Sequence, residues 1–370
     1  MHTNILFLTL RIFSATGGIE KVCRVVCKAL SDLTAENSAI GFAVYSMYDN
    51  SNQVDDKYLP ATAFKGFSQQ KINFAKAAVQ KGRNNKVVIL SHINLLKIGY
   101  LIKLFSPKTR VVLFAHGIEV WEPLNGFKRR LLKSYDTILC VSGFTRQKML
   151  DTHQLEPEKL LMLNNCLDPF LVLPENPVKD EKLLAGFGFT KTDIILLTLA
   201  RLSSKELYKG YDHVMQAIHV LKQEYPQIKY LIVGKYDDEE KQRLDAIITK
   251  LSLQNQVVFT GYIPDEELSK HYQIADLYIM PSKKEGFGIV FIEAMYYGLP
   301  VIAGNKDGSP DALLQGRLGL LVNPDDEAAI NQAIRQVILN TAAYKPHHEL
   351  LMENFGFDVY KDKLKNILQQ

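Results

Sequence analysis

The chain has 370 residues, of which 47% are hydrophobic and 23% charged, and its formal net charge is +4 at pH 7. That length favours two domains over one, and the hydrophobic fraction is sufficient for two cores. The charged fraction is typical of a soluble protein, and no apolar run reaches the ~18 residues that a membrane-spanning helix needs.

Apolar, β-branched runs alternate with helical patterns in the first half of the chain. The first run lacks the preceding basic residues and the cleavage site of a signal peptide, so we expect a buried strand there. Residues 19–33, which follow it, have the apolar spacing of a helix. This alternation predicts βα units and a parallel sheet. We predict strands at residues 4–10, 39–47, 86–91, 110–115, 136–141 and 159–163.

The pattern is interrupted at residues 168–190, where three prolines and several charges are typical of a linker. Afterwards it resumes, with helical spacing at 210–224 and 237–251. Two similar α/β halves make the cleft between them the default site. The predicted strands of the second half are 193–199, 229–234, 256–260, 276–280, 299–303 and 318–322.

Positive charge is concentrated in the first half. Residues 1–170 have 22 Lys and Arg against 13 Asp and Glu, whereas residues 171–370 have 22 against 27. Residues 57–118 contain eleven basic residues and no acidic one. This segment is either a solvated basic face or a surface for anionic lipid headgroups or an anionic acceptor. The interleaved Phe64, Phe67 and Phe74 favour docking on an anionic membrane. No RNP, helix-turn-helix or zinc-finger pattern supports nucleic acid as a partner.

The four cysteines do not form a CxxC pair, and Cys23 and Cys27 would share one face of a helix. No further metal ligands lie near them in the sequence, so we expect no metal site there. Buried free thiols in a reducing compartment are the better interpretation, which places the protein in the cytoplasm.

The stretch EGFGIVFIEAMYYGLP, residues 285–300, suggests a ligand site because it follows a predicted strand and opens a helix. The amides at a helix start, with their partial positive charge, suit a phosphate. Gly286 and Gly288 let the backbone approach a ligand. Glu293, one turn into the helix, could accept two hydrogen bonds from a ribose diol, and Glu285 could bind hexose hydroxyls. The alternatives are a solvent-facing Glu293 and an ordinary loop charge at Glu285.

Cations for a diphosphate follow another predicted strand. Arg201 lies at its end and Lys209 just before the next helix, while Lys205 is a competing cation. Near the start of the chain, Gly17 and Gly18 follow the first strand. They do not form GxGxxG, so the dinucleotide fingerprint is absent, although they could bring backbone amides near a phosphate or form a simple turn.

Together these residues resemble family 4 retaining glycosyltransferases. EGFGIVFIE resembles the family's E-x7-E signature, with Glu285 and Glu293 at the two glutamate positions. VVFTGYIPDEEL resembles the segment before it. Arg201, Lys209 and the Gly17–Gly18 pair resemble the family's phosphate-binding elements. His116, in FAHG, resembles its active-site histidine, and VSGFTR resembles a segment near the end of its first domain.

The resemblance implies an α/β protein of the GT-B fold, with two Rossmann-like domains facing across a cleft. The expected acceptor domain is residues 1–170, with a final helix at about 355–370 packing back onto it. Residues 171–354 would form the nucleotide-sugar domain.

The resemblance also assigns roles to individual residues. Arg201 and Lys209 would bind the donor pyrophosphate, Glu293 the ribose and Glu285 the transferred sugar. His116 would orient a sugar hydroxyl or stabilise an oxocarbenium-like state. The further donor-binding positions are Gly17 and Gly18 and the amides around Gly286, Phe287, Gly288, Ile289 and Val290, with the backbone of Ile263 near the base.

Two features depart from the family pattern. The insert between Arg201 and Lys209 is long, which puts the lysine assignment in doubt. Cys166 in NNCLD stands where the family usually has Gly, which puts the hinge geometry in doubt. Three acidic pairs could imitate a metal site, but the helix-start position of two of them favours capping. We expect no metal and no cofactor. The pairs are Asp55–Asp56, Asp237–Asp238 and Asp325–Asp326.

The predicted function is therefore retaining, metal-independent transfer of a hexose from a nucleoside diphosphate sugar, UDP being preferred over GDP. The acceptor would be a glycan or lipid-linked glycan of cell-surface polysaccharide or lipopolysaccharide synthesis, handled in the cytoplasm or peripherally on the cytoplasmic face of the membrane. A sugar-nucleotide epimerase of the related two-domain fold is the main alternative. An NAD enzyme and a non-catalytic carbohydrate-binding protein are the others.

Overall fold

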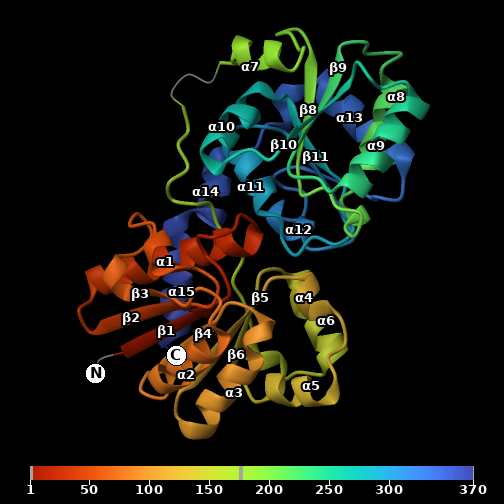
Figure 1. The fold of residues 1–370 in the computed structure, drawn as a ribbon. Coiled ribbons are helices and arrows are strands. Elements are labelled where there is room, and N and C mark those ends of the chain that lie inside the picture. The colour runs from red at the N-terminus through yellow and green to blue at the C-terminus, as the bar shows by residue number, and fades with distance from the viewer. Residues whose placement is uncertain (1–2, 175–177, 370) are drawn as a thin grey trace. The chain divides into compact units, whose positions relative to one another are not determined.

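The computed structural model describes residues 3–174 and 178–369. The chain forms two compact units, the first made of residues 1–169 and 354–370 and the second of residues 170–353. Figure 1 shows that each unit is a layered α/β structure with helices around a central sheet.

The sheet of the first unit is entirely parallel, with the strand order β3-β2-β1-β4-β5-β6-β7. The central strand β1 pairs with β2 on one side and β4 on the other, so that Leu6 lies opposite both Ala43 and Val88. The strands are β1 (Thr3–Thr9), β2 (Ile40–Ser46), β3 (Phe64–Gly66), β4 (Val87–Leu90), β5 (Arg110–Ala115), β6 (Thr137–Cys140) and β7 (Leu160–Met162).

The helices of this unit bury apolar faces against the sheet. Helix α1 buries Cys23 and Cys27 on one face, and all four cysteines are free and buried, as the sequence predicted. Helix α15, at the end of the chain, packs against α1, and Lys361 Nζ lies 2.7 Å from Glu36 Oε1. The helices are α1 (Gly18–Glu36), α2 (Lys71–Gly82), α3 (Leu96–Phe105), α4 (Ile118–Trp121), α5 (Gly126–Lys133), α6 (Gly143–His153) and α15 (Phe357–Gln369).

The second unit repeats this architecture with a parallel sheet of order β10-β9-β8-β11-β12-β13. Its central strand β8 pairs with β9 and β11, so that Leu197 lies opposite both Leu231 and Tyr278. The strands are β8 (Ile194–Leu199), β9 (Ile228–Val233), β10 (Val257–Gly261), β11 (Leu277–Met280), β12 (Val301–Gly304) and β13 (Leu320–Val322).

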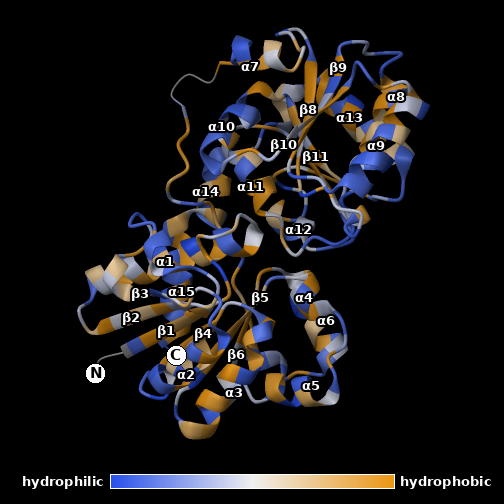
Figure 2. Ribbon diagram, viewed as in Figure 1, coloured by the Kyte–Doolittle hydropathy of each residue, from blue (hydrophilic) through white to orange (hydrophobic). Residues whose placement is uncertain are grey.

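Figure 2 shows hydrophobic residues concentrated on the strands of both sheets, as expected where helices cover both faces. The helices are α7 (Glu181–Gly186), α8 (Tyr211–Leu221), α9 (Asp238–Leu251), α10 (Asp265–Ile274), α11 (Ile289–Tyr296), α12 (Ser309–Ala312) and α13 (Glu327–Leu339), while α14 (His348–Phe355) spans the division between the units.

All twelve predicted strands are present. The prediction for the three phenylalanines of the basic segment 57–118 was wrong. Phe64 begins β3, an edge strand that the sequence analysis missed. Phe64 and Phe67 are 7% exposed and Phe74 is completely buried. These three rings therefore belong to the core, and the prediction that they dock on a membrane is wrong. The predicted linker 168–190 contains α7, and its residues 175–177 lie outside the described chain.

Across residues 3–174 and 178–369, no helix is both long enough and apolar enough to span a bilayer.

Candidate functional site

The second sheet reverses its winding direction between β8 and β11. From β8 the chain moves to β9 on one side, and later returns to β11 on the other side. In open parallel sheets, ligands bind where the loops after two such strands separate. The loop after β8 contains Arg201 and Lys209, and the loop after β11 contains Glu285.

The structure brings Lys209 and Glu285 together at this switch point. Lys209 Nζ donates a hydrogen bond to Glu285 Oε2 at 2.6 Å, and the two side chains are 16% and 19% exposed. Burial lowers the pKa of Lys209, but the charge and hydrogen bond of Glu285 outweigh it and raise that pKa above its ordinary value. Lys209 is therefore a fixed cation. An ammonium has three N–H donors and Glu285 takes one, which leaves capacity for a phosphate.

The two loops contact each other through their backbones as well. Lys283 donates its N–H to the carbonyl of Tyr208 at 2.9 Å. Gly210, between Lys209 and α8, has φ +80°, and a Cβ there would lie 2.4 Å from the carbonyl oxygen of Pro281. Glycine is needed at this position for both its backbone conformation and its close contact. Lys209 is thereby held against the loop that contains Glu285.

The backbone of Glu285 is fixed from the other side by the loop after β12. Its N–H donates to Asp307 Oδ2 at 2.7 Å, and its carbonyl accepts from Gly308 N–H at the same distance. Asp307 Oδ1 also accepts from Ser309 N–H at 2.9 Å. Burial raises the pKa of Asp307 to about 6, although the Ser309 hydrogen bonds lower it. Sequence analysis missed Asp307, and its position directly after a buried strand was the available signal.

Helix α11 begins at Ile289, immediately after the loop that contains Glu285. Gly288 precedes it with φ +87°, and the amides of its first turn, including those of Ile289 and Val290, have no acceptor within the helix. Glu293 does not face solvent, because it is 2% exposed and its Oε2 accepts from the Tyr272 hydroxyl at 3.0 Å. Tyr272 is a second residue that sequence analysis missed. Phe287 is also buried, with 1% of the residue exposed.

Arg201 has a different environment from Lys209. Its side chain is 70% exposed, and its guanidinium forms an ion pair with Glu206 in the same loop. The insert is ordered by Asp237, whose Oδ2 accepts from Ser204 N–H at 3.0 Å. Lys205, the competing cation of the sequence analysis, is exposed. The structure thus pairs Arg201 and Lys209 with separate carboxylates, and places Lys209 next to Glu285.

The remaining predicted donor-site residue of this unit is Ile263. It follows β10, which is two strands away from β8 in the sheet, and its side chain is half-buried. No hydrogen bond joins it to Glu285 or Lys209 among the contacts of the described residues. Gly286 lies within the ordered loop, since a Cβ on Gly308 would be 2.1 Å from its carbonyl oxygen.

In the first unit, Gly17 and Gly18 lie at the start of α1, after the central strand β1. A Cβ on Gly17 would lie 2.6 Å from Glu20 Oε2, whereas a Cβ on Gly18 would meet no atom within 4 Å. The preceding loop is held by the buried Asp49, which accepts from the N–H groups of Ile12 and Ser14 at 2.7 and 2.8 Å. Asp49 also accepts from the Ser46 hydroxyl at 2.6 Å.

His116 follows β5 in this unit and is held in one protonation state. Its Nε2 lies 2.8 Å from the carbonyl oxygen of Ser91, and a carbonyl can only accept, so Nε2 bears the proton. Its backbone N–H donates to Glu119 Oε1 at 2.6 Å, and its ring stacks on Phe114. Burial lowers the pKa of His116 to about 4. The imidazole is therefore neutral at pH 7, with a lone pair on Nδ1.

At least one member of each acidic pair has a partner within the protein. Asp237 caps α9, Asp326 caps α13, and Asp325 pairs with Lys283 and Lys306. Those two lysines lower the pKa of Asp325 to about 2. In the first unit, Asp55 Oδ1 accepts from Lys57 N–H at 3.2 Å. No group of three His, Cys, Asp or Glu residues suited to a metal ion occurs in the described parts of the chain.

Two family models match the chain in succession. Residues 16–169 match "Glycosyltransferase Family 4", and residues 179–351 match "Glycosyl transferases group 1". A GDP-mannose-dependent α-(1-6)-phosphatidylinositol monomannoside mannosyltransferase of Mycolicibacterium smegmatis is 30% identical over 62% of this chain and 61% of its own length. The chain therefore spans less than two thirds of that relative. An uncharacterized glycosyltransferase of Haemophilus influenzae is 27% identical over 98% of this chain and 99% of its own length.

Among solved structures, HepE of Anabaena in complex with UDP and glucose superimposes with a TM-score of 0.82. The alignment covers the whole of both chains at 19% identity. Such similarity establishes the fold, which is GT-B, with two parallel-sheet α/β domains.

Proposed function

This chain belongs to glycosyltransferase family 4, and we propose that it transfers a hexose from a nucleoside diphosphate sugar to a glycan or lipid-linked acceptor. The observation that supports this most strongly is the pairing of Lys209 with Glu285 at the switch point of the second sheet. A cation for the diphosphate and a carboxylate for the sugar then lie within one hydrogen bond of each other, just before the start of α11.

The donor's parts can be assigned to the surrounding groups. Lys209, Arg201 and the first amides of α11 bind the diphosphate, because they are positive groups in the loops that follow β8 and β11. Glu293 binds the ribose hydroxyls with its buried carboxylate, which Tyr272 orients. Glu285 binds hydroxyls of the sugar, and the backbone of Ile263 contacts the base.

In the proposed step, the bond between the anomeric carbon and the β-phosphate oxygen breaks while the acceptor oxygen bonds to the same carbon. The departing phosphate takes the acceptor's proton on the same face of the sugar, so the anomeric configuration is retained. Negative charge grows on the β-phosphate, where fixed cations and amides stabilise it. Such preorganised groups usually make the largest catalytic contribution, on the order of 3 kcal/mol for one donor. The step as written uses no metal.

His116 enters this proposal as a neutral group. With its proton on Nε2 and its pKa near 4, it has an Nδ1 lone pair that can accept a hydrogen bond from a sugar hydroxyl. A neutral imidazole in this role orients the sugar without adding charge. Gly18, where a Cβ would meet no atom within 4 Å, leaves room for a phosphate or hydroxyl group at the start of α1, whereas the Glu20 carboxylate lies beside Gly17.

A relative supports the class of acceptor that we propose. The mycobacterial relative is named for a phosphatidylinositol mannoside, a lipid-linked acceptor. We propose an acceptor of the same broad class, used in cell-surface polysaccharide or lipopolysaccharide synthesis at the cytoplasmic face of a membrane. UDP is the first candidate for the base from the sequence, and the GDP-mannose dependence of that relative makes GDP the direct competitor.

Isothermal titration of the full chain with UDP, GDP, ADP and CDP tests the proposal. One diphosphate should bind at least about tenfold more tightly than the others, since base contacts give discrimination of this size. Acceptor-dependent release of that diphosphate from its hexose conjugate should follow. Binding of none of the four, or turnover of the sugar nucleotide to an isomer without any acceptor, would contradict glycosyl transfer.

A further inference from the structure

Helix α3 in the first unit has an apolar face that does not point into the core. Its inward side buries Leu96, Ile98, Gly99 and Ile102. On the outward side, Leu101, Leu104 and Phe105 are 38%, 59% and 63% exposed. Lys97, Leu101 and Leu104 follow helical spacing, so they form one stripe, and the exposed Lys108 lies just beyond the helix end.

Helix α5 packs against α3 and extends this surface. It buries Leu131 and Leu132, while Phe127 is 60% exposed. Figures 1 and 2 show the two helices next to each other at one end of the first unit. The exposed basic residues of α5 are Lys128, Arg129, Arg130 and Lys133.

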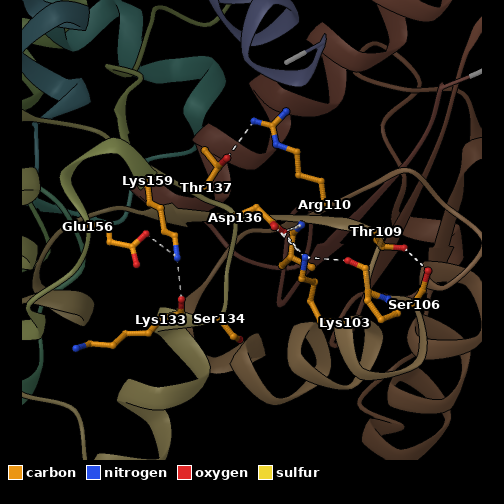
Figure 3. Close-up of polar contacts among 12 residues, drawn as sticks. Lys103, Ser106, Thr109, Arg110, Lys133, Ser134, Asp136, Thr137, Glu156 and Lys159 are labelled. Atoms are coloured by element: carbon orange, nitrogen blue, oxygen red, sulfur yellow. Dashed lines mark hydrogen bonds and ion pairs between the residues drawn. The ribbon is translucent and has the colours of Figure 1, made fainter.

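Neither α3 nor α5 contains an acidic residue. The exposed Glu122 precedes α5, and Glu156 pairs with Lys159 beside the end of α5. The nearest carboxylate along the chain after α5 is Asp136, and it is used internally. Lys103 Nζ donates to its two oxygens at 2.8 and 2.9 Å, and Asp136 Oδ2 also accepts from Val111 N–H at 2.7 Å. Figure 3 shows Lys103 directed at Asp136, whereas the side chain of Lys133 extends away from this network. Among the ion pairs of the described residues, none involves Lys128, Arg129, Arg130 or Lys133, which leaves these side chains available to an external anion.

We propose that this α3–α5 face, made of Leu101, Leu104, Phe105, Phe127 and the basic residues around them, docks the protein on an anionic lipid bilayer. Leu104, Phe105 and Phe127 enter the interfacial region, and the Lys and Arg side chains reach the lipid phosphates. A surface with bulky apolar groups and an excess of cations, on two helices that contain no acidic residue, is complementary to a negatively charged bilayer.

The inference rests on the proposed function for the choice of a lipid surface rather than an acidic protein, because a lipid-linked acceptor requires access to a membrane. Leu101, Leu104 and Phe105 take the membrane-docking role that the sequence analysis gave to Phe64, Phe67 and Phe74, which are buried. The new surface extends past that segment to α5.

Sedimentation of the full chain with vesicles tests the proposal without any donor or acceptor. We expect binding to vesicles of phosphatidylcholine and phosphatidylglycerol, weak binding to phosphatidylcholine alone, and loss of binding in high salt. The triple variant Lys128→Gln/Arg129→Gln/Arg130→Gln should lower the partition coefficient about a hundredfold, since each cation contributes about a factor of five near an anionic surface. Leu104→Ser/Phe105→Ser should lower it by about tenfold and Phe127→Ser by less, because less apolar surface is removed.

Matched controls come from the second unit. Leu339 is 74% exposed, and Lys250 and Lys270 are exposed, so Leu339→Ser and Lys250→Gln/Lys270→Gln should leave vesicle binding unchanged. Nucleoside diphosphate titration of every variant separates loss of docking from loss of folding or of the donor site. The proposal is overturned if the unmodified protein ignores anionic vesicles, or if the α3–α5 variants bind as well as the controls. Binding to an acidic polypeptide in place of the vesicles would also overturn it.

Discussion

The two units have the same topology at their switch points, but the side chains that follow their strands differ in charge. In the second unit, the loops after β8 and β11 bring together cations and carboxylates, with Lys209 on Glu285 and Arg201 on Glu206. In the first unit the sheet reverses direction between β1 and β4. His116 follows the neighbouring strand β5 and is neutral, with its pKa near 4 and its Nε2–H on the carbonyl of Ser91, which follows β4. The sheet therefore determines where a ligand can bind, and the loop residues determine its charge.

This difference suggests a division of tasks between the units. Charged groups already held in place suit the diphosphate of a donor, because its negative charge increases during bond cleavage. A neutral imidazole can accept a hydrogen bond from a hydroxyl group without adding charge to the site. The contrast can be tested by changing one charged or neutral group at a time.

The largest effect is expected for Glu285→Ala. Transfer should fall by at least about a hundredfold, because a positioned group that contacts the reacting sugar is worth several kcal/mol. Binding of the nucleoside diphosphate should be retained or strengthened, since Lys209 loses its carboxylate partner. Parallel measurements of turnover and calorimetric binding check this, with the exposed Glu266→Ala as control. Equal loss of both quantities would show that Glu285 is not a sugar-binding residue.

Asp307 should make the charged site sensitive to pH. Burial raises its pKa to about 6, and only the ionised form accepts fully from the backbone N–H groups of Glu285 and Ser309. We expect kcat/KM for the donor to fall as pH decreases below about 6. Asp307→Asn should be about tenfold less active at pH 7.5, the size of one lost charge-assisted hydrogen bond, and should lose this pH dependence.

Stability gives an independent check with a defined sign. Between pH 4 and 6 the folded protein keeps a proton on Asp307 that the unfolded chain has released, so this residue makes the free energy of unfolding fall as pH rises. Above pH 6 the contribution is constant. Chemical denaturation of the unmodified protein and Asp307→Asn should show a difference that changes only in this window. A constant difference from pH 4 to 8 would contradict the raised pKa.

A smaller effect is expected for Glu206→Gln. The carboxylate of Glu206 competes with a phosphate for the Arg201 guanidinium, but Arg201 is 70% exposed and such pairs are weak. Nucleoside diphosphate affinity should rise by about threefold, as calorimetry can measure. Weaker binding in this variant would mean that Glu206 holds Arg201 in its binding position.

The smallest change is expected at His116, the neutral counterpart. NMR of its ring should show a single neutral form from pH 8 down to about 5, because burial keeps the pKa near 4. Nitrogen-15 shifts should assign the proton to Nε2. Titration near pH 6.5 would remove the contrast between the two units.

The sequence allowed the strands, the two α/β halves and the placement of Glu293 one turn into a helix to be predicted, because apolar periodicity and glycine positions are local signals. It missed β3, whose three residues are too short to show a pattern. It also misassigned Phe64, Phe67 and Phe74, because the burial of residues on an edge strand, in the turn after it and on the next helix depends on tertiary packing.

The unpredicted parts of the site are contacts between distant segments. Asp307 reaches Glu285 across 22 residues, and Asp49 reaches Ile12 across 37. Sequence spacing gives no indication of such pairs. The choice between Lys205 and Lys209 had the same difficulty, because it depends on how the insert after Arg201 folds against Asp237.

The most direct test of the charged donor site is calorimetric titration of the preferred nucleoside diphosphate into the unmodified protein, Lys209→Ala and Lys205→Ala. The account predicts that Lys209→Ala weakens binding by about 10- to 100-fold, the range of a hydrogen bond to a charged group, while the exposed Lys205→Ala changes it less than twofold. Unchanged affinity in Lys209→Ala, or a larger loss in Lys205→Ala, would contradict it.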